Sequence, residues 1–269
     1  MKRKSFLTFT GVILLGLLIS CGTPAQTVPT EAPSETIAPK QQEELPTATT
    51  LPPTDTSTPE PTATVALTAT PETQIFRDDF DGSFQPGWTW EAEDSKKWSF
   101  VDIDGKQWLQ IIGNSGRSNV LTRDIPSGDF AIVAHIKADP RLNFHQANIF
   151  VFQDSSNYVV VNTGYCQPCP VGGYGYFMET VATGGDALGH HYEAPRAADD
   201  TDVYLKIDVV DNVISGYFAT TPGEWTHIGR FGNFFELNSI GLSATNSSPP
   251  SGTLEDIVAQ FDFFEVTMP

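Results

Sequence analysis

Basic residues are scarce in this chain of 269 amino acids. Lysine and arginine together number 15 against 33 acidic residues, which gives a formal net charge of −18 at neutral pH. A nucleic-acid-binding surface needs clustered cations to contact phosphates. The composition therefore predicts that nucleic acid is not a partner of this protein.

Aromatic residues are missing from the 53 residues between Gly22 and Gln74. All 30 aromatic residues lie either in the first 20 positions or from Phe76 onward. Because a folded core needs large apolar side chains, the aromatic-free segment is excluded as a globular domain. The 195 residues from Ile75 to Pro269 have the length of one domain, and we expect them to form one.

The sequence also lacks an apolar run long enough for a stable membrane span. Its longest run extends from about Phe6 to Ile19, whereas a transmembrane helix needs roughly 20 apolar residues. Lys2, Arg3 and Lys4 precede this run. A short apolar run behind a basic start is typical of a secretion signal, which we place at residues 1–20.

The leader ends in Leu18-Ile19-Ser20-Cys21-Gly22, which resembles the bacterial lipobox. This resemblance implies that Cys21 is acylated and becomes the mature N-terminus. Each buried methylene contributes about 0.8 kcal/mol, so two or three acyl chains hold a protein on a membrane. The alternative is an ordinary signal peptide in which Cys21 is incidental. We expect an extracytoplasmic protein that is lipid-anchored to the bacterial cell membrane or outer membrane, and glycine after Cys21 favours surface display.

Residues 21–74 are rich in proline and threonine, with 10 prolines and 15 threonines after Cys21. Proline fixes φ and removes amide donors, and seven acidic residues face a single lysine, Lys40. We expect a disordered linker that holds the next domain away from the lipid, with an upper reach of about 160 Å in polyproline II. Two interpretations stay open, a stalk glycosylated on threonine and an inert spacer.

Strand patterns recur from Ile75 to Pro269, and no segment between them has a helical period. Phe130, Ile132, Ala134 and Ile136 share one face of a strand, as expected for a half-buried antiparallel sheet. Turn residues such as Asp104-Gly105 separate the strands. The predicted strands span residues 75–80, 97–103, 107–113, 129–137, 146–153, 157–163, 174–181, 202–210, 212–219, 224–230, 238–244 and 257–267.

This many antiparallel strands must fold over one another to bury their inner faces. The predicted fold class is therefore all-β, a two-sheet antiparallel β-sandwich. Residues 157–163 are apolar on both faces and are predicted to lie in the middle of it. Five aromatic residues are assigned to the core: Phe80, Trp108, Phe130, Phe261 and Phe263.

Several motifs in this domain resemble a known family. They are DDFDG at 78–82, GWTW at 87–90, NIFVFQDSSNYVVV at 148–161, TPGEWTHIG at 221–229 and FDFFEV at 261–266. Their order and spacing are similar to those of concanavalin A-like jelly rolls, especially the bacterial DUF1349 type and the C-terminal domains of some β-xylosidases. The resemblance implies a sandwich whose first and last strands are neighbours, and an association with glycans. Residues 164–201 depart from the family pattern.

Catalytic motifs are absent. The Glu-x-Asp-x-x-Glu arrangement of laminarinase-like enzymes, which would supply the paired carboxylates of glycoside hydrolysis, is not found. Glu91, Glu93 and Asp94 form the nearest acidic cluster, but they lie beside Lys96 and Lys97 and fit a solvated rim better. No nucleophile elbow, zinc-protease motif or phosphate loop is present either. We therefore expect a protein that is not an enzyme.

Cys166 and Cys169 form a CQPC motif in the departing segment. Thiols oxidise outside the cytoplasm, and Cys21 is taken up by acylation, so a local disulfide is expected. A redox role needs a helix start behind the first cysteine, and the sequence GGYGYF that follows favours strand and turn. Zinc binding with His190 and His191 is disfavoured because adjacent residues of an extended chain point in opposite directions.

Sugar recognition needs flat apolar surfaces for C–H faces and planar polar groups for hydroxyls. Plain packing is the competing interpretation for every aromatic residue. The candidates for carbohydrate binding lie in loops or opposite the core: Trp90, Tyr165, Tyr174, Tyr176, His190 and His191, with His135, Asn148 and Asn162 as polar neighbours.

Calcium is a candidate structural ion. Asp79 and Asp81 lie in the first predicted strand and Asp262 in the last, and the family resemblance makes these strands neighbours. Carboxylates that approach one another repel unless a cation such as Ca²⁺ neutralises them. The alternative is that strand alternation separates Asp79 and Asp81 from Asp78, and that Arg77 pairs with one carboxylate.

Three functions follow from these observations. The first is a lipid-anchored module that binds a polysaccharide or other glycan without cleaving it. The second is a structural or protein-interaction module of the cell envelope with no small ligand. The third is a glycan-active enzyme with an unrecognised site, which the missing carboxylate pair disfavours.

Overall fold

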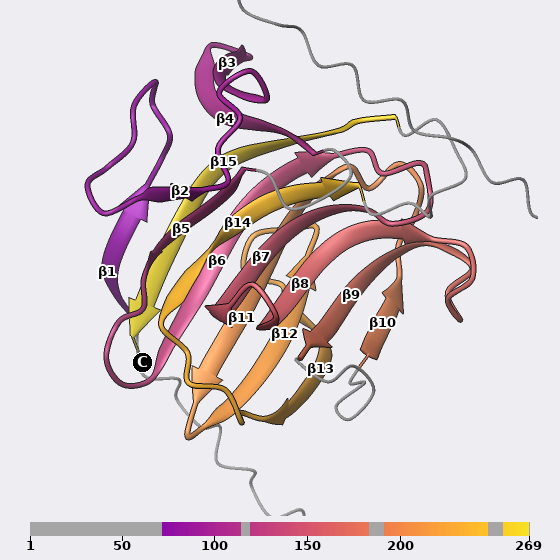
Figure 1. Ribbon diagram of the computed structural model, residues 1–269. Coiled ribbons are helices and arrows are strands. Elements are labelled where there is room, and N and C mark those ends of the chain that lie inside the picture. Colours follow the sequence, from indigo (N-terminus) through magenta and orange to yellow (C-terminus); the bar gives the residue numbers. More distant parts are fainter. Residues whose placement is uncertain (1–71, 114–118, 183–190, 247–254, 269) are drawn as a thin grey trace, which may run out of the picture. The chain divides into compact units, whose positions relative to one another are not determined.

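The computed structural model describes residues 72–113, 119–182, 191–246 and 255–268. The described strands belong to two antiparallel sheets that pack face to face (Figure 1). The leader, Cys21 and the linker up to residue 71 lie outside the described residues. Within the described ranges, no helix has the length and hydropathy needed to cross a bilayer.

The first sheet has eight strands. Seven of them lie in one hydrogen-bonded order, and the eighth, β1, pairs with the C-terminal part of β15. In spatial order its strands are β13 (Thr226–Gly232), β12 (Val213–Ala219), β11 (Asp202–Val210), β6 (Phe130–Ala138), β15 (Ile257–Met268), β4 (Lys106–Gly113) and β3 (Trp98–Ile103), with β1 (Thr73–Asp78) beside β15.

The second sheet has seven strands and lies over the first. In spatial order they are β10 (His191–Pro195), β9 (Gly173–Val181), β8 (Asn157–Cys166), β7 (His145–Asp154), β14 (Ser239–Asn246), β5 (Val120–Asp124) and β2 (Thr89–Glu91).

These sheets confirm the predicted fold class and the antiparallel pairing. All twelve predicted strands are present, and β2, β5 and β10 are additional short strands. The expected contact between the first and last strands is also confirmed, because Arg77 of β1 is paired with Glu265 of β15. The folded chain starts earlier than Ile75, however: Thr73 and Gln74 pair with Met268 and Thr267.

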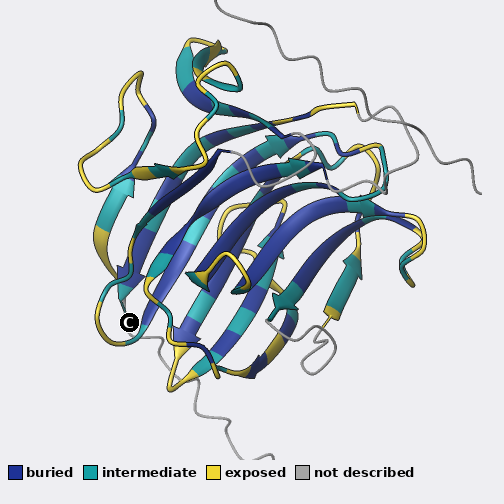
Figure 2. Cartoon of the chain, in the orientation of Figure 1, coloured by how far each residue is buried: buried dark blue, intermediate teal, exposed yellow. Residues whose placement is uncertain are grey.

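The core lies between the sheets and follows strand alternation. Ile132 and Ile136 of β6 and Ile149 and Val151 of β7 are fully buried in one hydrophobic cluster. Figure 2 shows this burial as dark blue bands along the central strands of both sheets. Since successive strand residues point to opposite faces, the residues between these positions are left on the outer surfaces of the sandwich.

A buried carboxylate organises the segment after β1, where the DDFDG motif lies. Asp78 is 1% exposed and accepts hydrogen bonds from the backbone nitrogens of Phe80 and Gln85 and from Nε1 of Trp88, at 2.8–2.9 Å. Phe80 has a φ of 50° and inserts a fully buried ring into the core. The acidic residues of this motif therefore differ in role, and Asp78 is structural.

Four of the five predicted core aromatic residues are buried, and Phe263 is not. Trp108 is buried, but it points away from the neighbouring core residue Leu109 and contacts His135, with ring centroids 5.1 Å apart. A register shift between Phe261 and Phe263 turns Phe263 outward, whereas Phe264 enters the core. The burial predicted for Trp108 is therefore confirmed, although on the outer face of its sheet, and the prediction for Phe263 is wrong because the bulge reverses the alternation.

Candidate functional site

The outer surface of the seven-stranded sheet carries polar and aromatic side chains together, and we call this surface the open face. Its residues alternate with core residues along four neighbouring strands. They are Gln146, Asn148, Phe150 and Phe152 of β7, Tyr158, Val160 and Asn162 of β8, Phe177 and Glu179 of β9, and Ser243 and Thr245 of β14.

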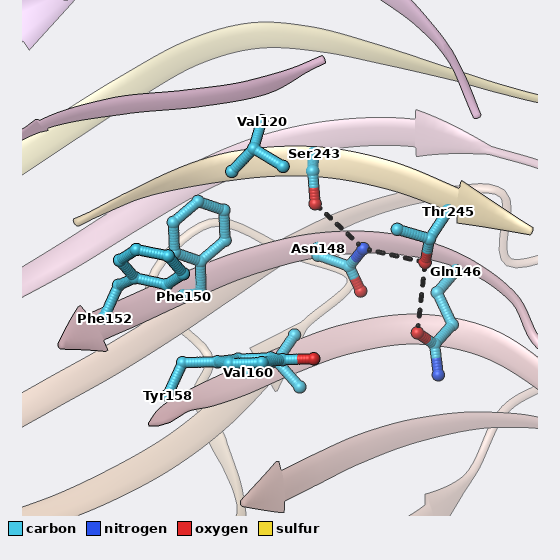
Figure 3. A pocket seen from close by; sticks show the side chains of 9 residues that line it. All are labelled: Val120, Gln146, Asn148, Phe150, Phe152, Tyr158, Val160, Ser243 and Thr245. Carbon is cyan, nitrogen blue, oxygen red and sulfur yellow. Dashed lines mark hydrogen bonds between the residues drawn. The ribbon is translucent and has the colours of Figure 1, made fainter. Parts of the chain in front are cut away.

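A hydrogen-bond network crosses the middle of the open face. The side-chain amide of Asn148 donates to Ser243 Oγ and to Thr245 Oγ1, both at 3.2 Å. Thr245 Oγ1 in turn donates to Gln146 Oε1 at 3.3 Å (Figure 3). This network ties β7 to β14 and fixes the orientation of the Asn148 side chain.

Glu179 extends the network toward β9. Its Oε1 accepts hydrogen bonds from the side-chain amides of Gln146 and Asn162, each at 3.3 Å. Among the described residues no lysine or arginine forms an ion pair with Glu179. The carboxylate therefore adds to the open face a negative charge that no described lysine or arginine pairs with.

Two amide oxygens of this network have no partner in the described structure. Asn148 and Asn162 are opposite each other on β7 and β8, at 3% and 0% exposure, and the Oδ1 atom of each is buried without a hydrogen bond. Leaving a buried acceptor unpaired costs about 1–3 kcal/mol. A buried acceptor without a partner needs an explanation. A ligand that donates a hydrogen bond to Asn148 Oδ1 would provide one.

Aromatic rings form the wall at one end of the open face. Phe152 lies with its ring centroid 5.8 Å from that of Phe150 and 6.1 Å from that of Tyr158. With Val120 and Val160 they enclose a hollow of about 60 Å³ whose other wall is Asn148 and its hydrogen-bond partners (Figure 3). Apolar rings thus stand directly beside amide and hydroxyl groups.

A second hollow adjoins the first, and Gln146 lines both. It has a volume of about 270 Å³, and Phe177, Glu179 and His191 also line it. The disulfide between Cys166 and Cys169, whose Cα atoms are 5.4 Å apart, borders the same hollow. The cysteines are therefore joined as expected, and they brace one end of the open face.

One group of potential metal ligands lies near this disulfide. Ligand atoms of Cys169, His191 and Glu193 lie within 4.8 Å of one another. The sulfur of Cys169 is bonded to Cys166, so it is not a thiolate, which is the form of cysteine that ligates metals. In the disulfide form the group offers a metal only two ligands, and we assign it no ion.

A larger hollow of about 400 Å³ lies on the outer face of the eight-stranded sheet, beside Tyr204 and Trp225. The charged groups that line it are all paired: Lys206 Nζ is 2.9 Å from Glu72 and 3.1 Å from Asp208, and Glu265 is 3.2 Å from Arg77. Burial lowers the pKa of Lys206, but these carboxylates raise it by more, so the lysine stays cationic. Because this face satisfies its own charges, we place the candidate site on the open face in spite of the smaller hollows there.

Four of the predicted sugar-binding residues meet at the open face or its border. Asn148 and Asn162 are cross-strand partners. His191 of β10 lies opposite Glu179 and lines the second hollow, as does Tyr165 at the end of β8. The structure therefore brings together residues from three separate parts of the sequence.

Other predicted sugar-binding residues lie elsewhere. Tyr176 is 1% exposed and stacks on Phe218 at 3.8 Å, so it is a core residue and its assignment to binding is corrected. Trp90 points inward and packs against Trp98, with ring centroids 5.1 Å apart. Tyr174 packs on the edge of the Tyr165 ring at 5.0 Å.

His135 and His190 are not part of the described site. His135 belongs to β6 in the other sheet, where its ring nitrogens lie 2.9 Å from Asp262 and 2.5 Å from Asp202. It also stacks on Tyr204 at 4.2 Å, and so it is separated from Asn148 by the thickness of the sandwich. His190 lies outside the described residues.

The three aspartates of the predicted calcium site do not cluster. Asp79 pairs with Arg77 at 2.7 Å, and Asp262 pairs with Lys106 at 2.6 Å. Asp81 is exposed, and none of the three belongs to the group of potential metal ligands found among the described residues. Cations of the protein thus take the place of calcium at Asp79 and Asp262, and the geometry does not support the calcium prediction.

Sequence reasoning missed much of the open face. Phe150, Phe152 and Tyr158 were not among the candidates, nor were Gln146 and Glu179. A signal was present, because residues 146–153 and 157–163 alternate between two sets. Away from the turn at 153–157, the amides Gln146, Asn148 and Asn162 fall in the same set. Residues 157–163, predicted to be apolar on both faces and to lie in the middle of the sandwich, have one face in the core and the other on the hollow.

No model of a known protein family matches the sequence, and no curated protein matches it. Solved structures do match. The GH43 protein BlXynB from Bacillus licheniformis has a TM-score of 0.59 at 17% identity, covering 71% of this chain and 38% of its own. A xylan β-1,4-xylosidase from Bacillus halodurans has a TM-score of 0.56 at 18% identity, covering 71% and 39%.

A GH16 protein from Bacteroides ovatus, solved with the product G4G4G3G, has a TM-score of 0.52 at 14% identity. This match covers 71% of the present chain and 99% of the other. The fold is that of a concanavalin A-like sandwich. The chain spans less than half the length of the GH43 proteins that it matches, and so the likeness is one of a single domain.

Proposed function

We propose that this chain is a surface-displayed lipoprotein whose sandwich binds carbohydrate at the open face without cleaving it. The observation that carries the proposal is the unpartnered, buried Oδ1 of Asn148 at the edge of an aromatic hollow. A sugar chain presents both a hydroxyl donor for such an oxygen and apolar C–H faces for rings such as Phe152 and Tyr158.

The likeness to domains of carbohydrate-active proteins supports an association with glycans. It does not extend to their activities. We propose a non-catalytic role because both carboxylates near the hollows hold hydrogen bonds of the scaffold. Glu179 accepts hydrogen bonds from two side-chain amides, and Glu193 accepts one from the backbone nitrogen of Val171 at 3.2 Å.

Binding is tested with an array of purified polysaccharides, probed with the full-length protein in detergent. We expect retention on at least one polymer, and loss of that signal by tenfold or more in Asn148→Ala. Gln260→Ala is the matched control, because Gln260 donates a similar amide hydrogen bond to Gln110 on the outer face of the other sheet. It should bind as the parent protein does.

Two other outcomes would favour the competing functions. A protein that binds no polymer on the array, in a folded state, points to a structural or protein-interaction module. Release of new reducing ends from a bound polymer, lost in Glu179→Gln, points to an enzyme.

The membrane anchor is tested separately at Cys21. The variant Cys21→Ala is expected to leave the membrane fraction and the detergent phase, because it removes the acceptor of the acyl chains. Unchanged partitioning of Cys21→Ala would refute the anchor and leave the binding proposal standing.

A further inference from the structure

We infer that the open face selects uncharged, hydroxyl-rich glycan chains and rejects chains that carry carboxylate or sulfate groups. This inference rests on the carbohydrate-binding role proposed above and adds the class of ligand. It comes from the distribution of charge between the two sheets and from the kind of hydrogen-bonding group that the open face leaves unpaired.

Cations are segregated to the sheet that does not form the site. The strands of the eight-stranded sheet contain five basic residues: Arg77, Lys106, Lys137, Lys206 and Arg230. The seven strands behind the open face contain five acidic residues but a single lysine or arginine, Arg123, besides the histidines His145 and His191. The strands of the eight-stranded sheet also contain six acidic residues, so their net charge is −1 (5 − 6), whereas that of the seven strands behind the open face is −4 (1 − 5). The site is therefore built on the more negative sheet.

Arg123 does not reach the open face. Its guanidinium carbon lies 3.1 Å above the centre of the Phe76 ring and 5.4 Å from that of Trp88, on the inner side of the sheet. Its β5 neighbour Leu121 is fully buried, and the same alternation places both residues on the core side. Arg123 is the single lysine or arginine of the seven strands, so these strands offer no such cation to an anionic ligand on the open face.

Among the described residues, the buried side-chain atoms of the open face that lack a hydrogen bond are acceptors, Oδ1 of Asn148 and Oδ1 of Asn162. Asn148 Oδ1 has no donor, and Glu179 presents a carboxylate with no cationic partner among the described residues. A sugar hydroxyl donates to both, whereas a carboxylate or sulfate brings further acceptors and a like charge. Like charges brought together at a binding surface weaken the wrong complex, and so the same groups that bind a neutral chain reject an anionic one.

The shape of the site favours a chain over a free monosaccharide. Its two hollows, of about 60 and 270 Å³, are smaller than the roughly 300–1,000 Å³ of pockets that engulf small molecules. They are joined at Gln146 and extend from the aromatic wall on β7 and β8 to His191 on β10. From β14 to β10 the sheet crosses four strand spacings, roughly 19 Å, which is enough for several sugar rings.

The inference is tested with one polymer in two charge states. Mixed-linkage β-glucan and neutral arabinoxylan serve as probes, each beside a derivative whose primary hydroxyls have been oxidised to carboxylates. Binding of the full-length protein in detergent is measured by affinity electrophoresis at low salt. We expect at least one neutral polymer to retard the protein, and its carboxylated form to bind about tenfold more weakly or not at all.

Salt and charge removal show whether repulsion is the cause. Raising the salt concentration shortens the range of electrostatic repulsion, and so the carboxylated form should regain part of its binding while neutral binding changes little. Glu179→Gln should narrow the difference between the two forms. Glu224→Gln is the matched control, because it removes an exposed carboxylate from the β12–β13 loop of the other sheet.

The outcomes separate the inference from the proposed function. Equal or tighter binding of the carboxylated form overturns the charge selection and leaves carbohydrate binding intact. Binding of neither form overturns both. The inference is also overturned if Glu224→Gln reduces the preference for the neutral form as much as Glu179→Gln does, because the selection would then not depend on the open face.

Discussion

Neighbouring residues on β7 offer a direct prediction about stability and binding. Asn148 and Ile149 are adjacent in sequence, but Asn148 lines the hollow and Ile149 is fully buried in the core. Asn148→Ala and Ile149→Ala should therefore have opposite effects. The first is expected to abolish glycan binding at almost unchanged stability, and the second to lower stability while the folded protein still binds.

The magnitudes follow from the contacts. Asn148→Ala removes two hydrogen bonds, which stabilise by about 0.5–1.5 kcal/mol each, but it also removes a buried unpaired oxygen that costs about 1–3 kcal/mol. The two contributions cover the same range with opposite signs, so they cancel at their central values. Ile149→Ala leaves a cavity in the core and should cost about 2–5 kcal/mol.

Thermal unfolding of the full-length protein, followed by tryptophan fluorescence, measures this difference. All five tryptophans lie between Trp88 and Trp225, so the signal reports on the sandwich. At about 2–4 °C per kcal/mol for a domain of this size, Ile149→Ala should lower Tm by about 4–20 °C and Asn148→Ala by less than about 4 °C. A loss of Tm in Asn148→Ala as large as that in Ile149→Ala would refute the assignment of these residues to opposite faces.

Other predictions concern the edges of the domain. A fragment that starts at residue 72 should be more stable to urea than one that starts at 75, because Glu72 bonds Lys206 and Thr267; equal midpoints would contradict this. Burial raises the pKa of Asp262, but hydrogen bonds from Lys106 and His135 lower it by more. The stability that Asp262 contributes should therefore be present above its ordinary pKa of about 3.8 and be lost as pH falls through the lower pKa of the folded state. In Asp262→Asn the urea midpoint should fall less over this acid range than it does in the parent protein. Melting curves with calcium and with chelator should coincide, since Asp79 and Asp262 already pair with cations; a rise in Tm with calcium would restore the calcium site. Alkylation followed by mass spectrometry should label Cys166 and Cys169 after reduction only.

Strand alternation made the sandwich predictable, because it repeats in nearly every segment. Residues 130–136 and 203–209 each place four apolar side chains on one face, and both faces enter the core. The short strand β10 was missed because its five residues, His191–Pro195, are mostly polar and end in proline. It pairs with β9 through its backbone, and such pairing leaves little trace in the sequence.

The site was predicted only in part, for a related reason. Asn148 and Asn162 are polar residues between apolar ones, so they stood out, and their pairing across β7 and β8 brings them together. Phe150 and Phe152 did not stand out, since an aromatic residue in an apolar strand fits the core equally well. Which of two apolar faces is the core is decided by the opposite sheet, and a local pattern does not contain that information. His135 was predicted as a polar neighbour of the site because it too is a polar residue in an apolar strand, but it belongs to the other sheet.

The central claim is that a glycan chain lies on the open face, and hydroxyl-radical footprinting tests it most directly. Tyr158 lines the first hollow, whereas Tyr204 lines the hollow on the opposite sheet, and both are half-buried. Adding the neutral polymer that binds best is expected to reduce the oxidation of Tyr158 severalfold and to leave that of Tyr204 unchanged. Protection of Tyr204 with Tyr158 unaffected would contradict the claim.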